Sequence, residues 1–209
     1  MPEISEHWDR TYATKPDVEL SWFEREPTMS LRWICQEVRG RSDAIIDVGG
    51  GTSELVDRLV QQGFTDVTVL DIAANALDRV QTRLASEARL VHFVHHDVLT
   101  WNPERTYDVW HDRAVFHFLT DANDRANYVS LSARGVKPGG AVVLATFAED
   151  GPTHCSGLPV ARYSPVAAAE IFGAAFTLVA HEREEHRTPG GVVQPFTWVV
   201  LRRLSAANG

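Results

Sequence analysis

Short apolar runs alternate with amphipathic stretches between residues 44 and 148, and this alternation restricts the fold more than any other feature of the chain. It is typical of parallel strands covered by helices. Beyond it, two strand-like runs flank a turn that contains Pro189-Gly190-Gly191, which predicts an antiparallel hairpin. The expected strands are residues 44–48, 66–70, 91–94, 107–110 and 141–147, followed by the hairpin strands 176–184 and 193–204.

Helix signals lie between these runs. Ser53, Asp121 and Ser164 are suited to cap three helices, and Gly173 is suited to end the last of them. Residues 77–84 carry apolar side chains at the three-and-four spacing of one buried helix face. We therefore expect an α/β fold: a seven-stranded, mostly parallel sheet with helices on both faces and a C-terminal antiparallel hairpin.

The chain of 209 residues fits one domain, residues 1–209, with a core formed by residues 41–209. Residues 1–40 are rich in aromatic side chains, and we expect this segment to pack across the sheet as a cap or lid. Its aromatic residues include Trp8, Tyr12, Trp22, Phe23 and Trp33. Trp33, at helical spacing with Ile34, is expected in the core instead.

Composition excludes several functional classes. Twenty Lys and Arg against 28 Asp and Glu give a net charge of −8, which argues against nucleic acid as the main partner. No apolar run approaches the length of a membrane span, and no secretory signal pattern is present. Two cysteines, Cys35 and Cys155, cannot form a disulfide framework. We expect a cytoplasmic protein that is a monomer or a homodimer and does not bind membranes.

The strongest local motif is a buried strand that runs into three glycines and then a helix. Gly49, Gly50 and Gly51 allow a sharp turn and a close approach of a ligand to the backbone. A dinucleotide fingerprint would place a further glycine at position 54, where this chain has Glu54. Asp47, just before the turn, instead suits a cationic amino-acid ligand. S-adenosylmethionine, which has a sulfonium, an ammonium, a carboxylate and no phosphate, fits this arrangement.

Acidic residues also follow the next two expected strands. Asp71 ends the second strand and could accept hydrogen bonds from both ribose hydroxyls. Asp97 follows the third strand and could accept from an adenine amino group while Val98 or Leu99 packs on the ring. Any one of these aspartates could instead be a turn or cap residue. All three together favour a nucleoside site.

On these residues the chain resembles the class I S-adenosylmethionine-dependent methyltransferases over nearly its whole length. The resemblance rests on Asp47-Val-Gly-Gly-Gly, Asp71, Asp97, Lys137-Pro-Gly-Gly and the closing hairpin. It implies a Rossmann-like fold with S-adenosyl-L-methionine as cofactor and S-adenosyl-L-homocysteine as product. The implied cofactor contacts are Trp8, Tyr12, Trp22, Asp47, Gly49, Gly50, Gly51, Asp71, Ile72, Asp97, Val98 and Arg113. The family usually has a glycine where this chain has Ser53.

A shorter resemblance concerns the methyl acceptor. The run from Trp110 to Val115, with Asp124-Arg125 and Tyr128, is similar to the thiopurine and small-thiol methyltransferase branch. The Asp-Arg pair of that branch implies a contact of Arg113 on the cofactor side. This resemblance implies a small acceptor, above all a thiol or another soft nucleophile. Protein lysine methyltransferases show a related acidic motif, so a lysine acceptor is an alternative, as is a non-catalytic binding module.

A general base is needed only where the nucleophile is protonated at the working pH. Asp112 is the first candidate for orientation or proton acceptance and His117 the second, and a structural salt bridge is the alternative for Asp112. Adjacent His95 and His96 lack the spacing of a metal site, so we expect no metal. Cys155 follows His154 near the expected acceptor pocket and could bind a soft acceptor or simply pack.

Overall fold

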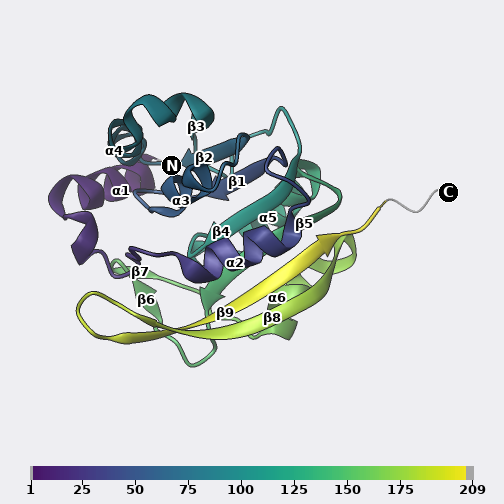
Figure 1. Ribbon diagram of the computed structural model, residues 1–209. Coiled ribbons are helices and arrows are strands. Elements are labelled where there is room, and N and C mark those ends of the chain that lie inside the picture. The colour runs from purple at the N-terminus through teal and green to yellow at the C-terminus, as the bar shows by residue number, and fades with distance from the viewer. Residues whose placement is uncertain (1, 206–209) are drawn as a thin grey trace.

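In the computed structural model, which describes residues 2–205, seven strands form one sheet in the order β3-β2-β1-β4-β5-β9-β8 (Figure 1). β1 to β5 are parallel, and β9 runs antiparallel to both β5 and β8. The strands are β1 (Ile45–Val48), β2 (Val67–Asp71), β3 (Val91–His95), β4 (Tyr107–Arg113), β5 (Val136–Phe147), β8 (Phe176–Arg187) and β9 (Val193–Arg203). The predicted sheet and closing hairpin are confirmed. Residues 1 and 206–209 of the predicted domain lie outside the described residues.

Helices cover both faces of this sheet (Figure 1). They are α1 (Pro2–Thr14), α2 (Thr28–Glu37), α3 (Leu55–Gln61), α4 (Ala74–Leu84), α5 (Ala122–Gly135) and α6 (Pro165–Phe172). The Asp121 side chain accepts from the N–H of Asn123 and caps α5, and Ser164 caps α6 in the same way. Ser53 Oγ accepts from Leu55 N at 3.1 Å, although α3 itself begins after Glu54.

Side-chain alternation along the strands divides the interior into two cores. On one face, Ile45 packs with the apolar sides of α2, α3 and α4, and Trp33 of α2 is 7% exposed, as predicted for a core residue. On the other face, Ile46 packs with α5 and α6 around Trp110 and Phe172. Burial on both faces explains why the parallel strands read as nearly continuous apolar runs.

Several strands are longer than predicted, and β8 extends to Arg187, three residues past its predicted end at position 184. β4 continues three residues past the predicted end at position 110, to Arg113, and β5 begins at Val136, five residues early. The pairing of β4 with β5 is irregular near the start of both strands, since Tyr107 pairs with Val136 but Val109 pairs with Ala141. The extra residues of β5 form a bulge, in which Gly139 has a φ of 80°. An additional two-stranded ribbon, β6 (His154–Cys155) and β7 (Leu158–Pro159), was not predicted.

The N-terminal segment lies over the end of the sheet at which β1 and β2 finish, beside α4 (Figure 1). Asn75 Nδ2 donates to Asp9 O at 2.7 Å and Arg79 Nη1 donates to Tyr12 O at 2.8 Å, so α4 holds α1 directly. Ser5 Oγ donates to Ile72 O at 3.2 Å. The aromatic segment is therefore attached where parallel strands present their carboxyl ends. Within residues 2–205, no helix has the length and apolarity needed to cross a membrane.

Candidate functional site

A cavity of about 350 Å³ opens at the carboxyl ends of β1, β2 and β4. From β1 the sheet continues to β2 and β3 on one side and to β4 and β5 on the other, so the strand order reverses at β1. Ligands of open α/β sheets bind at such a topological switch point. The lining residues that the sequence predicted as cofactor contacts are Trp8, Tyr12, Trp22, Gly49, Asp71, Ile72, Asp97, Val98 and Arg113. The structure thus brings nine of the twelve predicted contacts to one hollow.

The other three predicted contacts, Asp47, Gly50 and Gly51, do not line this main cavity. Asp47 and Gly50 line a neighbouring cavity of about 40 Å³, which shares Trp22, Gly49 and Arg113 with the main one. We call this the small cavity. Since these three residues line both cavities, the cavities adjoin.

Close packing within the protein requires glycine at positions 49 and 51. Both have positive φ, 65° and 52°. A Cβ at Gly49 would lie 2.0 Å from Val115 Cγ2, and one at Gly51 would lie 2.1 Å from Tyr12 Oη. The sequence analysis explained these glycines by the close approach of a ligand to the backbone. The structure adds a second reason, because the N-terminal segment and the residues after β4 close against the turn.

Asp71, the last residue of β2, connects the glycine turn to the next helix. Its Oδ2 accepts from Gly51 N at 2.7 Å and its Oδ1 accepts from Ala73 N at 2.8 Å. The side chain lines the main cavity and is nearly buried, and this burial raises its pKa to about 6. Each carboxylate oxygen has a second lone pair, so the group can still accept from a ligand hydroxyl.

The residues after β3 form the adjacent wall. Asp97 Oδ1 accepts from Leu99 N at 2.9 Å, which fixes the turn, while Val98 is 8% exposed and lines the main cavity. Ile72 lines the same wall, and its carbonyl is in contact with His95 Nε2 at 3.1 Å. A flat ring between Ile72 and Val98 would meet apolar side chains, with the Asp97 carboxylate close by.

Arg113, at the end of β4, borders both cavities. Its Nη1 donates to Trp22 O at 3.0 Å, and its Nη2 is 3.2 Å from Glu24 Oε1. Its Nε and Nη2 are buried and make no hydrogen bond with any residue of the described chain. A buried guanidinium with unsatisfied N–H groups suits a carboxylate ligand, because the two can form parallel charge-assisted hydrogen bonds.

Aromatic rings form another part of the cavity wall. The Trp8 ring meets Phe118 and Trp22 edge to face, at centroid distances of 5.2 and 5.8 Å, and lies 6.3 Å from Tyr12. Phe118 was not among the predicted contacts. Its position two residues after Phe116, past the end of β4, resembles ordinary core sequence, so only the fold shows that it lines the cavity.

Asp112, the first predicted catalytic residue, is fully buried and does not line either cavity. Its carboxylate accepts from Val115 N at 2.9 Å, from Phe116 N at 3.1 Å and from the Tyr128 hydroxyl. Burial raises its pKa to about 6. Asp112 thus holds the turn after β4 against α5. This structural role differs from the salt bridge considered as the alternative, and we assign Asp112 no proton transfer.

His117, the second candidate, is fully buried between Phe118 and Phe147, with ring centroids at 4.5 and 4.8 Å. Both ring nitrogens are without a hydrogen bond among the described residues. Burial and, second, the nearby Arg113 charge lower its pKa to about 3. A neutral imidazole that is absent from the cavity lining cannot reach an acceptor in this arrangement, so we assign it no catalytic role.

The main cavity is also lined by residues that are not among the predicted cofactor contacts, most of them apolar. Cys155 of β6 lines it, and burial raises the pKa of its thiol to about 11, so the group stays protonated at neutral pH. His154 does not line the cavity. Further lining residues of this group are Ile4, Phe118, Leu119, Thr120, Asp124, Leu158 and Pro159. Sequence reasoning connected Asp124 and the Leu158-Pro159 pair with the acceptor but not the first four.

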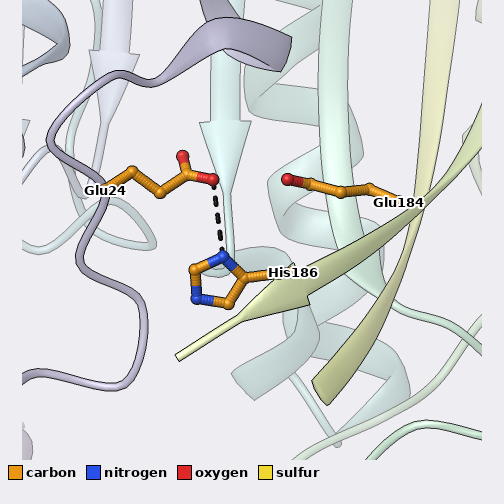
Figure 2. A group of neighbouring side chains, drawn as sticks. All are labelled: Glu24, Glu184 and His186. Carbon is orange, nitrogen blue, oxygen red and sulfur yellow. Dashed lines mark ion pairs between the residues drawn. The ribbon is translucent and has the colours of Figure 1, made fainter. Parts of the chain in front are cut away.

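Glu24, Glu184 and His186 form a cluster (Figure 2). Arg113 contacts this cluster through Glu24. Glu24 comes from the N-terminal segment and the other two from β8, with His186 Nδ1 3.4 Å from Glu24 Oε1. Their ligand atoms lie within 4.8 Å of one another, a spacing open to a metal ion. The Arg113 guanidinium, 3.2 Å from Glu24 Oε1, already supplies a positive charge to these carboxylates without a metal. The sequence-based expectation of no metal stays a prediction.

His186 also joins the hairpin to the segment that carries Trp22. Its Nε2 is 2.7 Å from Ser21 O, and Trp198 Nε1 of β9 donates to Glu184 Oε2 at 2.7 Å. The Trp198 bond holds β9 to β8, while the His186 contact with Ser21 O and the Arg113 bond to the Trp22 carbonyl attach residues 21 and 22 to the sheet. No local sequence pattern shows this, since the partners lie more than 90 positions apart.

Comparison with known proteins agrees with this arrangement. Residues 45–140 match the family described as "Methyltransferase domain". Among curated proteins, the chain is 25% identical over 154 residues to EEF1A lysine methyltransferase 2 of Danio rerio. That match covers 66% of this chain and 66% of the relative, which is just under two thirds of each.

Solved structures show the same fold. N-methyltransferase NodS from Bradyrhizobium japonicum WM9, in complex with S-adenosylhomocysteine, has a TM-score of 0.72 at 14% identity, over 96% of this chain and 98% of that one. A 1,6-didemethyltoxoflavin-N1-methyltransferase from Burkholderia thailandensis scores 0.70 at 17% identity, over 98% and 86%. A protein from a study of the conversion of a disulfide bond into a thioacetal group during echinomycin biosynthesis scores 0.76 at 16%, over 98% and 93%.

The matched segment contains the glycine turn, the three strand-end aspartates and Arg113. These are the residues that surround the two adjoining cavities. Residues 45–140, the segment that is similar to the methyltransferase domain family, therefore supply most of the charged residues of both cavities.

Proposed function

We propose that this chain is an S-adenosylmethionine-dependent methyltransferase that acts on a small acceptor, above all a thiol or another soft nucleophile. The observation that carries the proposal is the lining of the main cavity: its charged residues are Asp71, Asp97, Arg113 and Asp124, and most of its other lining side chains are apolar or aromatic. A volume of about 350 Å³ is of the size of small-molecule sites.

The charged residues match the parts of S-adenosylmethionine in order along the strand ends. Asp71 would accept from the ribose hydroxyls, and Asp97 would accept from the adenine amino group. The unsatisfied N–H groups of Arg113 would donate to the methionine carboxylate. Asp47, in the small cavity, would then face the methionine ammonium. In this placement the cofactor extends from its adenine, near Val98, to its methionine ammonium, in the small cavity, and passes the aromatic rings.

When bound, S-adenosylmethionine supplies a methyl group on a positively charged sulfur. Trp8, Tyr12 and Trp22 line the main cavity and would exclude water from the methyl group during the transfer. A well-placed aromatic face also stabilises a nearby cation by roughly 0.5 to 2 kcal/mol. These side chains would align the two reactants, which is the main contribution a protein can make to an in-line transfer.

The acceptor end supports a nucleophile that needs little help with deprotonation. Cys155 keeps its proton, and Asp112 and His117 lie behind the wall. A thiol with an ordinary pKa of about 8.5 is already partly ionised at neutral pH, whereas a hydroxyl would need a base. Apolar contacts with Leu119, Leu158 and Phe118 suit a soft, poorly hydrated group.

A protein lysine is the second candidate, because the curated relative is named as a lysine methyltransferase. Asp124 lines the acceptor end and could hold an ammonium group before transfer. The structural neighbours do not decide between these acceptors: two are named as N-methyltransferases, and one comes from a study of sulfur chemistry.

The acceptor prediction can be tested with methyl-labelled S-adenosylmethionine, a panel of small thiols and amines, and a cell lysate. We expect label in small thiols. Label that appears in lysate protein alone would replace the small acceptor with a protein side chain. No transfer in any arm, with the cofactor still bound, would support the non-catalytic module.

The aromatic wall gives a prediction about turnover. We expect Trp22→Ala to lower kcat/KM about 10- to 100-fold, because Trp22 borders both cavities and contacts Trp8 and Tyr12. Trp33→Ala is the matched control: this buried tryptophan lies outside both cavities and should mainly lower the free energy of unfolding, by about 3–5 kcal/mol. Similar losses of turnover and stability in Trp22→Ala would place Trp22 in the core instead.

A further inference from the structure

We propose that His111 and Ser30 are positioning residues that hold the Asp47 carboxylate against the ammonium group of the cofactor. The proposal rests on the proposed function, since it concerns the same cofactor. It assigns a role to two residues that neither the motif pattern nor the comparisons single out.

The three side chains form a continuous buried chain of hydrogen bonds. His111 Nδ1 is 2.7 Å from Asp47 Oδ1, and His111 Nε2 is 3.0 Å from Ser30 Oγ. Asp47, His111 and Ser30 are 3%, 2% and 1% exposed, so bulk water cannot replace any member. All three line the small cavity beside Gly50 and Arg113.

The fold fixes this arrangement from three directions. Asp47 and His111 are register partners on the adjacent parallel strands β1 and β4, so their side chains leave the same face of the sheet side by side. Ser30 comes from α2, which packs across β4 (Figure 1). Trp198 of β9 lies against the imidazole, with ring centroids 6.2 Å apart. The imidazole therefore has little freedom to turn.

One carboxylate oxygen is held and the other faces the glycine turn. Oδ1 is engaged by His111, while Oδ2 would lie 2.8 Å from a Cβ placed on Gly50. A carboxylate held in this way needs no rearrangement when a cation arrives, which reduces the cost of binding. The small cavity is also lined by Arg113 and by Glu24, whose Oε1 is 3.2 Å from Arg113 Nη2. A cavity that holds both carboxylates and a guanidinium can complement the two charges of an amino-acid zwitterion.

The same order of side chains, carboxylate to imidazole to hydroxyl, also activates serine nucleophiles in hydrolases. Here the Ser30 hydroxyl is 1% exposed and borders a cavity of only about 40 Å³. That space does not admit a second substrate. The arrangement therefore fits a positioning role and not covalent catalysis.

The test compares two ligands that differ at the amino-acid end. S-adenosylhomocysteine carries the ammonium and carboxylate groups, and 5′-methylthioadenosine lacks both. Calorimetry should give the dissociation constants of both ligands for the unaltered protein and for Ser30→Ala, His111→Asn and His111→Leu. Ser132→Ala is the control, because Ser132 is equally buried but lies in α5 and lines neither cavity.

We expect His111→Leu to weaken S-adenosylhomocysteine binding about 10-fold, because the Asp47 carboxylate loses the donor that orients it. Ser30→Ala should weaken it about 3-fold, since His111 loses its outer partner. His111→Asn should recover much of the loss, because its amide N–H can replace Nδ1–H. The affinity for 5′-methylthioadenosine should stay within about 2-fold throughout, as it should for both ligands in Ser132→Ala.

Two outcomes would overturn the inference while leaving the proposed function intact. One is unchanged S-adenosylhomocysteine affinity in His111→Leu. The other is an equal loss for both ligands, which would mean that His111 supports the whole site and not its amino-acid end. If the unaltered protein bound neither nucleoside, the proposed function itself would fail, and the two failures are thereby distinguishable.

Discussion

Asp71→Ala is expected to weaken S-adenosylhomocysteine binding about 100-fold. Two hydrogen bonds from ribose hydroxyls to a buried carboxylate account for this, at about 1.5 kcal/mol or more each, and 2.7 kcal/mol corresponds to 100-fold. The carboxylate is already oriented by Gly51 N and Ala73 N, so it need not move to accept them. Calorimetry measures the change in the dissociation constant.

Asp66→Ala is the matched control for this variant. Asp66 lies just before β2, at the opposite end from Asp71, and forms an ion pair with Arg105. Its loss should leave the cofactor affinity within about 2-fold, because distant substitutions act independently. The melting temperature should be measured for both variants, since Asp71→Ala also removes the acceptor of two backbone N–H groups. Unchanged affinity in a folded Asp71→Ala protein would remove Asp71 from the site.

The raised pKa of Asp71 adds a pH dependence to the same measurement. With a pKa of about 6 in the free protein, the carboxyl group is protonated at lower pH and accepts ribose hydroxyls less well. We expect affinity to fall below pH 6, approaching 10-fold per pH unit, and this dependence should be absent in Asp71→Ala. For folding the sign is opposite: ionising a group whose pKa is higher in the folded chain lowers stability as pH rises from about 4 to 6.

Gly51→Ala is expected to lower the free energy of unfolding by about 2–4 kcal/mol and to abolish tight cofactor binding. The added methyl group would lie 2.1 Å from Tyr12 Oη, on a residue whose φ is 52°. Relief requires α1 to move away from the turn, which opens the aromatic wall of the main cavity. Chemical denaturation and calorimetry measure the two effects.

Tyr12→Phe tests whether the clash is the cause. Removing the hydroxyl leaves the next Tyr12 atom, Cζ, at 3.0 Å from the added Cβ, so the double variant Gly51→Ala/Tyr12→Phe should recover part of the stability. Tyr12→Phe alone should be close to neutral, because no hydrogen bond of this hydroxyl is needed for the fold. If the double variant were as unstable as Gly51→Ala, backbone strain at position 51 would be the main cause.

Local patterns predicted where three strand-end acids of the candidate site lie in the fold. Asp47, Asp71 and Asp97 end or follow strands whose apolar runs are easy to recognise, and parallel strands end at one edge of the sheet. The same logic misplaced Asp112 and His117 as catalytic residues. Asp112 ends the next strand in the same way, yet its carboxylate turns into the interior, toward Tyr128. Periodicity cannot show which of two strand-end acids faces a ligand.

The sequence by itself determined the order of strands and helices along the chain and the glycine turn, because each depends on residues within about ten positions of one another. Only the tertiary structure decided how the aromatic segment closes the cavity, and it alone brought Ser30 to His111 and Glu24 to His186. Those contacts join residues 81 or more positions apart. Their geometry depends on how helices pack on the sheet, and no local periodicity carries that information.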